Sequence, residues 1–165
     1  MEVVVFLFPV LAYVELLVCN AKDRPHVLHR GLGVINRALT EHRGSNRRIY
    51  AVHFGQRGNY SQPDLSICDP RIKIRPQDGM IVVDTSFDAF VTRDEEDTRP
   101  SHDPSWGKTL AQIPNLKETK RLIVGGFHYN VPRHCCVEEF VEKARQYGLP
   151  TEVDSRLTNM AFNES

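Results

Sequence analysis

The sequence predicts an α/β fold in which helices cover both faces of a mostly parallel, doubly wound sheet. The run Val3–Phe8 is apolar at every position, which is typical of a central parallel strand buried on both faces. Strand-like and helix-like segments then alternate along the chain, and this order implies parallel strands joined by right-handed crossovers. With 165 residues the chain is predicted to form a single domain, residues 1–165.

Local patterns define each element. The first strand is expected to end at Pro9, which cannot donate to a strand ladder. Apolar residues recur at helical spacing from Pro25 to Arg43, and Gly44 is a natural stop. The other predicted elements are strands at 48–54, 80–83, 121–124 and 151–153, a short helical stretch at 108–116, a helix at 137–147 ending at Gly148, and loops at 55–76 and 92–106.

Charge and composition exclude several functional classes. The chain has 21 lysines and arginines and 21 aspartates and glutamates, so its net charge is zero. It therefore lacks the net positive charge that attracts nucleic-acid phosphates or anionic lipids. A hydrophobic content of 41% is that of an ordinary globular domain. We therefore expect no nucleic-acid partner and no membrane partner. The acidic run 94–97 is expected to lie on a solvated surface loop.

The four cysteines favour a reducing compartment. Cys19, Cys68, Cys135 and Cys136 show no Cys-x-x-Cys spacing and are too few for a disulfide scaffold, so a cytoplasmic location is predicted. The apolar N-terminal run allows a signal peptide as an alternative. Glu2 and the lack of an early Lys or Arg argue against one, and a buried strand continuing into an apolar loop or helix is preferred.

The segment 122–137 carries the first candidate for chemistry. An apolar strand runs into Gly125-Gly126, a polar loop follows, and Cys136 opens a helix. A thiol in the first turn of a helix lies near the positive end of the helix dipole, and His134 beside it favours the thiolate further. The alternative is that Cys135 and Cys136 are two small buried residues where the helix packs on the sheet.

The second candidate, Asp84, follows the third predicted strand directly. A carboxylate at the carboxyl end of a strand can act as a general base, bind a metal or orient a nearby base. It can equally cap the turn that follows. In an open parallel sheet the ligand lies beyond the carboxyl ends of the strands, so this edge is the expected site.

Several motifs together resemble the isochorismatase-like family of cysteine hydrolases, over essentially the whole chain. The motifs are Phe87-Asp88-Ala89-Phe90, Thr109-Leu110, Gly125-Gly126, Cys136-Val137, Ala144, Gly148 and Asp154. The resemblance implies a three-layer α/β/α fold. It also implies a pocket in which an Asp after the first strand, a Lys before the aromatic motif and a Cys at a helix start act as a triad.

Only one member of that triad is present here. Cys136 occupies the nucleophile position, Asp84 stands where the family has Lys, and Phe8 and Pro9 stand where it has Asp. A cysteine hydrolase of small amides, esters or related carbonyl compounds is therefore predicted, with Asp84 or a nearby histidine (His128 or His134) as base. The candidate catalytic residues are Cys136, Asp84 and His134, and the candidate substrate contacts are Phe90, His128, Tyr129, Cys135 and Pro9. Cys135 and Cys136 could exchange roles.

A catalytically silent binding or assembly subunit of the same fold is the alternative function. A dinucleotide-binding protein is disfavoured because no Gly-x-Gly-x-x-Gly follows the first strand. We predict no metal and no cofactor. Some family members bind zinc after the second strand, but here His53 has no partner ligand nearby in the sequence. A site built from His128, His134, Cys135 and Cys136 is disfavoured because adjacent cysteines chelate one ion poorly. The apolar stretch Val10–Val18 and the family resemblance favour a homo-oligomer.

Overall fold

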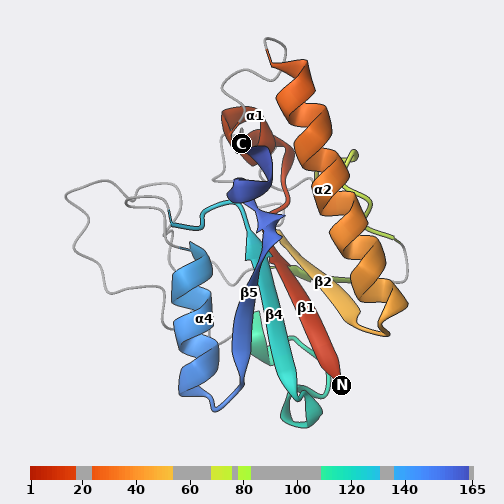
Figure 1. Cartoon of the computed structure of the whole chain (residues 1–165). Coiled ribbons are helices and arrows are strands. Elements are labelled where there is room, and N and C mark those ends of the chain that lie inside the picture. Colours follow the sequence, from red (N-terminus) through yellow and green to blue (C-terminus); the bar gives the residue numbers. More distant parts are fainter. Residues whose placement is uncertain (18–23, 54–67, 76–77, 83–108, 131–135, 164–165) are drawn as a thin grey trace, which may run out of the picture.

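The computed structural model has a five-stranded parallel sheet at its centre (Figure 1). It describes residues 1–17, 24–53, 68–75, 78–82, 109–130 and 136–163. The strand order is β3-β2-β1-β4-β5. The strands are β1 (Glu2–Leu7), β2 (Arg48–His53), β3 (Gly79–Val82), β4 (Arg121–Gly126) and β5 (Thr151–Thr158).

β1 lies in the middle of the sheet, as its uninterrupted apolar sequence predicts. It pairs with β2 on one side and with β4 on the other, and every residue from Val3 to Leu7 is at most 2% exposed. The chain passes from β1 to β2 in one direction and from β4 to β5 in the other. Right-handed crossovers that run in opposite directions place their helices on opposite faces. The three-layer fold predicted from the sequence is thereby confirmed.

The two long helices cover these two faces (Figure 1). α2 (Pro25–Gly44) buries an apolar stripe that includes Val27, Ile35 and Leu39. α4 (Cys136–Gln146) buries Val137, Phe140 and Ala144. Both follow the helical spacing read from the sequence, and Pro25 takes the first-turn position, where its missing N–H costs nothing.

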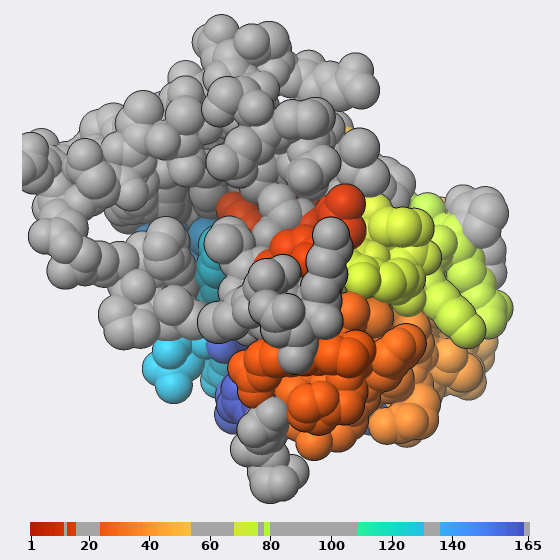
Figure 2. All heavy atoms as spheres, turned by 90° about the horizontal axis from the view of Figure 1, so that it is seen from above, coloured from red at the N-terminus to blue at the C-terminus, as the bar shows by residue number. Residues whose placement is uncertain are grey.

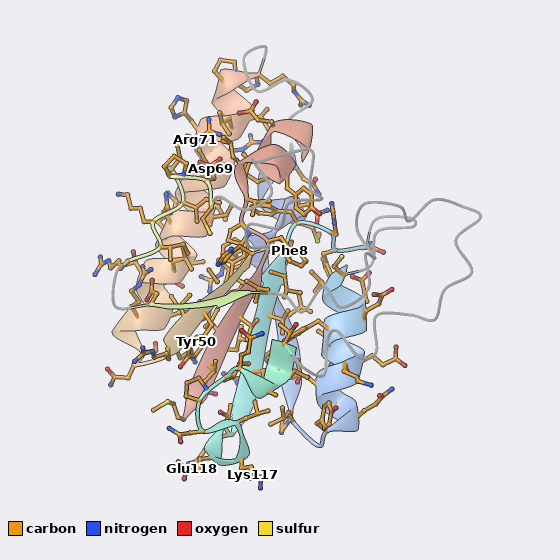
Figure 3. All side chains as sticks on the ribbon, turned by 180° about the vertical axis from the view of Figure 1, so that it is seen from behind. Phe8, Tyr50, Asp69, Arg71, Lys117 and Glu118 are labelled. Carbon is orange, nitrogen blue, oxygen red and sulfur yellow. The ribbon has the colours of Figure 1, made fainter. Side chains whose placement is uncertain are left out.

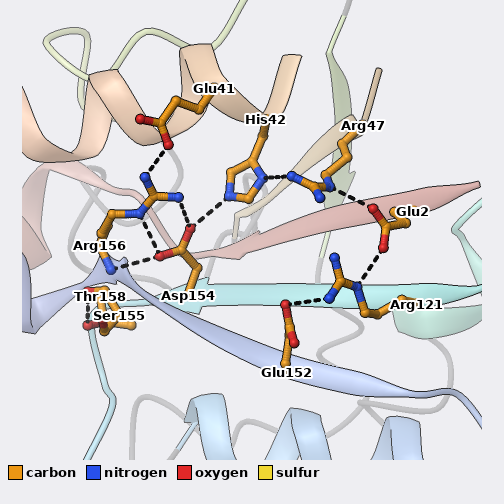
Figure 4. A network of polar contacts seen from close by, with 10 residues as sticks. All are labelled: Glu2, Glu41, His42, Arg47, Arg121, Glu152, Asp154, Ser155, Arg156 and Thr158. Atoms are coloured by element: carbon orange, nitrogen blue, oxygen red, sulfur yellow. Dashed lines mark hydrogen bonds and ion pairs between the residues drawn. The ribbon is translucent and has the colours of Figure 1, made fainter. Parts of the chain in front are cut away.

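A polar network joins α2 to β5 and the neighbouring strands (Figure 4). Asp154 Oδ2 accepts from His42 Nε2 at 2.8 Å and from the Arg156 guanidinium at 2.9 Å. On its other side the His42 ring receives a hydrogen bond from Arg47 at Nδ1, at 3.2 Å, so Nε2 is the nitrogen that donates to Asp154. Burial acts to raise the pKa of Asp154, but the hydrogen bonds from His42 and Arg156 outweigh it and hold this pKa well below its usual range.

The apolar N-terminal run continues beyond β1 into α1 (Leu11–Leu17). Phe8, at the end of β1, has a left-handed backbone with φ of 55° and is 1% exposed. Val10 and Val14 are buried in the chain's own core. In the described parts of the chain, no helix combines the length and apolarity needed to span a membrane.

Segment 68–75 lies against α1, as the view from above in Figure 2 shows. Val10 and Cys68 form an isolated antiparallel bridge, and the Asp69 N–H donates to the Pro9 carbonyl at 2.8 Å. Part of the predicted loop 55–76 is thus fixed to the chain just after β1, while residues 54–67 lie outside the described residues.

Two regions differ from the sequence prediction. β5 extends to Thr158 and is followed by η3 (Asn159–Phe162), whose Phe162 ring packs on Gly31; a Cβ on Gly31 would lie 2.2 Å from that ring. The stretch predicted to be helical at 108–116 has one helical turn at 109–111, and η2 (Leu116–Glu118) follows. Thr109, Leu110 and Ile113 are nevertheless buried, as residues of a packed helical turn would be.

Candidate active site

The candidate active site lies where the direction of strand order reverses, between the carboxyl ends of β1 and β4. These strands are hydrogen-bonded neighbours, with Leu7 opposite Gly126. The segment after β1 runs through Pro9 into α1, and the segment after β4 runs through His128 toward the start of α4. Ligands of open α/β sheets bind at such a reversal.

Cys136 is the first residue of α4 and faces this edge. Its thiol Sγ lies 3.9 Å from Nδ1 of His128, a long sulfur–nitrogen contact. The residue is 6% exposed, so the thiol is nearly buried. For Nδ1 to accept from the thiol, the imidazole must carry its own proton on Nε2. The geometry therefore gives a cysteine and histidine pair at the amino end of a helix.

Three contacts hold His128 in place. The Tyr13 ring, from α1, lies 4.3 Å from the His128 ring between centroids, at an interplanar angle of 44°. The His128 carbonyl accepts from the Val137 N–H at 3.3 Å. The next N–H, of Tyr129, donates to Asn159 Oδ1 at 3.0 Å. α1 thus packs on the imidazole, while α4 and η3 hold the backbone that carries it.

Gly126 allows the close approach of α4 to the sheet. A Cβ at this position would lie 2.8 Å from Val137 Cγ2 and 3.0 Å from Leu7 Cβ. At Gly125, a Cβ would lie 2.4 Å from Leu157 Cβ. Both glycines are required by packing, and the packing at Gly126 sets how near the first turn of α4 lies to the end of β1.

The turn after β4 is fixed by a left-handed residue and a carboxylate. Asn130 has φ of 57°, a conformation that asparagine tolerates better than most residues. Its N–H donates to Glu138 Oε2 at 2.9 Å. The other oxygen, Glu138 Oε1, is buried and has no hydrogen-bond partner among the described residues. Glu138 therefore acts as a support for the turn that carries His128.

The end of β1 presents no carboxylate. Phe8 fills the position with a buried ring, which packs edge-on against Tyr13 at 6.2 Å between centroids. The nearby carboxylate of Asp69 is fully buried, and it accepts from Arg71 at 2.9 Å (Oδ1) and 2.7 Å (Oδ2). Figure 3 shows Asp69 and Arg71 beside each other, apart from Phe8. Asp69 therefore serves an ion pair.

The structure brings four of the predicted site residues to one edge of the sheet. Cys136 and His128 are in contact, Tyr129 follows His128, and Pro9 is buried at the end of β1. The other four, Asp84, Phe90, His134 and Cys135, lie outside the described residues. Sequence analysis missed Tyr13, whose only signal was a tyrosine within a mostly apolar helical stretch.

Among the residues that the structure describes, no three His, Cys, Asp or Glu side chains are placed to hold an ion. Two members of the disfavoured cluster, His134 and Cys135, lie outside those residues. His53 is half-buried at the end of β2, and this burial lowers its pKa.

Cys68 offers an internal comparison for Cys136. Burial, with the nearby Asp69 carboxylate adding to it, raises the pKa of the Cys68 thiol to about 11. A thiol of this kind stays protonated at neutral pH and is a poor nucleophile. No helix begins at Cys68, whereas Cys136 has both a helix amino end and an imidazole beside it.

Comparisons with known proteins identify the fold. No protein-family profile matches the sequence, and no curated protein does. An isochorismatase from Pseudomonas putida KT2440 superposes with a TM-score of 0.61 at 16% identity, over 95% of this chain and 70% of that one. N-carbamoylsarcosine amidase from Thermoplasma acidophilum gives 0.61 at 12% identity, over 95% and 83%. An isochorismatase family protein from Burkholderia thailandensis gives 0.58 at 11%, over 95% and 78%.

The strand order of the sheet and the similarity to solved structures indicate the same class of fold. A parallel five-stranded sheet between α2 and α4, with its reversal between β1 and β4, defines a three-layer α/β/α protein. Within that class the chain has an isochorismatase-like fold, as its sequence motifs predict. At these identities the likeness establishes the fold and leaves the chemistry to be argued from this chain's own residues.

Proposed function

We propose that the protein is a hydrolase of small amides, esters or related carbonyl compounds, with Cys136 as the nucleophile. The observation that carries the proposal is the 3.9 Å approach of Cys136 Sγ to His128 Nδ1 at the first turn of α4. An imidazole can remove the thiol proton, and the helix amino end stabilises the thiolate. Two of the structural neighbours are named as an isochorismatase and an amidase, which agrees with this class.

The proposed reaction has two stages. His128 takes the thiol proton as Sγ attacks the substrate carbonyl, and a tetrahedral intermediate forms. The imidazolium then returns the proton to the leaving amine or alcohol, which departs and leaves a thioester on Cys136. Water, deprotonated by His128, attacks the thioester and releases the acid and the free thiol.

The Val137 N–H is not one of the donors for the oxyanion, because it is already bound to the His128 carbonyl. We propose Asp84 and His134 as further catalytic groups near Cys136. Phe90, Tyr129, Cys135 and Pro9 are proposed to contact the substrate, with Pro9 acting from its buried position at the end of β1.

The test is a panel of small amides and esters assayed with wild type, Cys136→Ser and Cys68→Ser. We expect Cys136→Ser to lose activity by orders of magnitude, because members of a nucleophile and base pair act as a unit. Cys68→Ser removes the thiol with the raised pKa and should retain activity. Activity that survives in Cys136→Ser would contradict the proposal.

One observation favours a second function, a catalytically silent binding or assembly subunit. Phe8 buries an aromatic ring where the family pattern has its Asp base. A silent protein has no need for a reactive thiol, so it predicts no turnover of any panel member and slow alkylation of Cys136. The hydrolase predicts fast alkylation of Cys136, which makes the two functions distinguishable even before a substrate is known.

We further propose that the protein is a cytoplasmic homo-oligomer. The cysteine usage supports the compartment. For assembly, Val10 and Val14 are buried within the chain's own core, so they are not available for a partner; Tyr147 and Met160 are large apolar side chains that stay exposed. A size measurement in solution tests this proposal, and a strict monomer would contradict it.

A further inference from the structure

A hollow lies at the opposite end of the sheet from Cys136, beside the amino ends of β1 and β2. Figure 1 shows the carboxyl end of α2 and the start of β2 meeting there. The hollow is open to solvent and has a volume of about 460 Å³. The side chains that line it are Arg43, Asn46, Arg47, Arg48, Arg75 and Asp78, together with Met1.

The lining of this arginine hollow is strongly cationic, although the whole chain has a net charge of zero. Two of the four guanidinium groups are neutralised by carboxylates, Arg43 by Asp78 and Arg47 by Glu2. Within the described part of the chain, Arg48 and Arg75 have no carboxylate partner. Two positive charges therefore remain uncompensated, and they come from different segments of the chain.

The walls of the hollow are held by contacts that leave these two charges available. Arg43 donates to the Lys73 carbonyl at 2.7 Å as well as to Asp78. Asp78 Oδ2 also accepts from the Arg75 backbone N–H at 2.8 Å, which fixes the segment that carries Arg75. Arg48 lies over the Tyr50 ring, with its guanidinium carbon 5.7 Å from the ring centroid.

The structural needs of α2 do not account for this arrangement. The negative end of the helix dipole favours one or two cations in its last turn, and Arg43 meets that need. Arg48 belongs to β2 and Arg75 to the segment before β3. Neither residue forms an ion pair with another described residue, so removing either charge should leave the fold intact.

We propose that the arginine hollow binds a small ligand that carries two or more linked phosphate groups. Guanidinium groups donate paired, parallel hydrogen bonds to phosphate oxygens, and such charge-assisted bonds are among the strongest in proteins. Among the described residues that line the hollow, Asp78 is the only one with a carboxylate, and Arg43 already neutralises it. Two uncompensated charges on separate segments match a ligand with several negative charges better than a single monoanion.

Calorimetric titration of the intact chain with inorganic pyrophosphate tests this inference. We expect saturable binding that weakens as salt is added. Arg48→Gln and Arg75→Gln should each weaken binding about tenfold, which is about 1.4 kcal/mol, because each removes one charged hydrogen-bonding group. Arg37→Gln, at an exposed position on α2 outside the hollow, is the matched control and should bind like wild type. Thermal unfolding of each variant verifies the fold.

Titrations with ADP, AMP and sulfate distinguish the sources of the phosphate. Binding of ADP and pyrophosphate with equal affinity supports recognition of the diphosphate alone, and tighter binding of ADP supports a nucleoside diphosphate. The inference is overturned if millimolar pyrophosphate does not bind, if sulfate and AMP bind as tightly as pyrophosphate, or if the Arg48→Gln/Arg75→Gln double variant binds like wild type. None of these results depends on the hydrolase activity proposed for Cys136.

Discussion

Cys136 Sγ lies 3.9 Å from His128 Nδ1 because the turn after β4 folds back on the first turn of α4. The His128 carbonyl accepts from the Val137 N–H, and the Asn130 N–H donates to Glu138. Each of these bonds joins the loop to α4 directly beside the thiol. The distance between the two side chains is thus set by the backbone of the turn, which makes it sensitive to the packing around that turn.

The Tyr13 ring should matter for the reactivity of Cys136 through its contact with His128. It packs on the His128 ring at 4.3 Å between centroids and limits how that imidazole can rotate. We expect Tyr13→Leu to slow the alkylation of Cys136 severalfold and Tyr13→Phe, which keeps a ring, to slow it less. Alkylation rates read by mass spectrometry test this order, and equal rates in the two variants would contradict the role given to the ring.

Gly126→Ala should destabilise the fold and disturb the site. The new methyl group would lie 2.8 Å from Val137 Cγ2 and 3.0 Å from Leu7 Cβ, so α4 must move away from the sheet. Overpacking of this kind costs about 1–3 kcal/mol in the free energy of unfolding. Gly44→Ala is the control, because nothing lies within 4 Å of its Cβ and it should be neutral or stabilising. Urea denaturation measures both, and an unchanged Gly126→Ala protein would contradict the close approach.

Asp154→Asn should lower stability in a way that depends on pH. The folded pKa of Asp154 lies below its unfolded value, so its ionised form stabilises the protein above about pH 4, and that contribution is lost as the pH falls. We expect a loss of about 2 kcal/mol at pH 7, because His42 and Arg156 lose a nearly buried partner, and a smaller loss at pH 3.

The control for that experiment is Glu118→Gln, at an exposed carboxylate on η2 that is not one of the network residues drawn in Figure 4. Its unfolding free energy should follow wild type at both pH values. A constant deficit of Asp154→Asn from pH 7 to pH 3 would show that its ionisation is not what stabilises the network in Figure 4.

The sequence predicted most of the fold because most elements carry their own local signal. The apolar run of β1 and the helical spacing of α2 are visible without knowledge of their neighbours. β5 was predicted to end at Val153, and the residues that extend it in the structure are mostly polar. In the structure the Asp154 carboxylate accepts a hydrogen bond from His42, which is 112 residues away in sequence. The longer β5 therefore depends on a tertiary contact that no local sequence pattern indicates.

Some residues of the candidate site could likewise be predicted from the sequence, and others could not. Cys136 could be found from the sequence because a strand, two glycines and a helix start lie next to one another along the chain. From the sequence, either His128 or His134 could act as the base, and His134 was placed among the catalytic candidates and His128 among the substrate contacts. The structure brings His128 into contact with Cys136. The Tyr13 contact with His128 joins α1 to the turn after β4, and no pattern along the chain indicates such a contact.

The most direct test of the account is the pH dependence of Cys136 alkylation by iodoacetamide in wild type and in His128→Asn, read site by site by mass spectrometry. We predict that Cys136 reacts with an apparent pKa well below the ordinary thiol value of about 8.5, that His128→Asn moves this pKa upward, and that Cys68 stays slow. If Cys136 reacts no faster than Cys68, or if its profile is the same in His128→Asn, then the pair is not a working nucleophile and base.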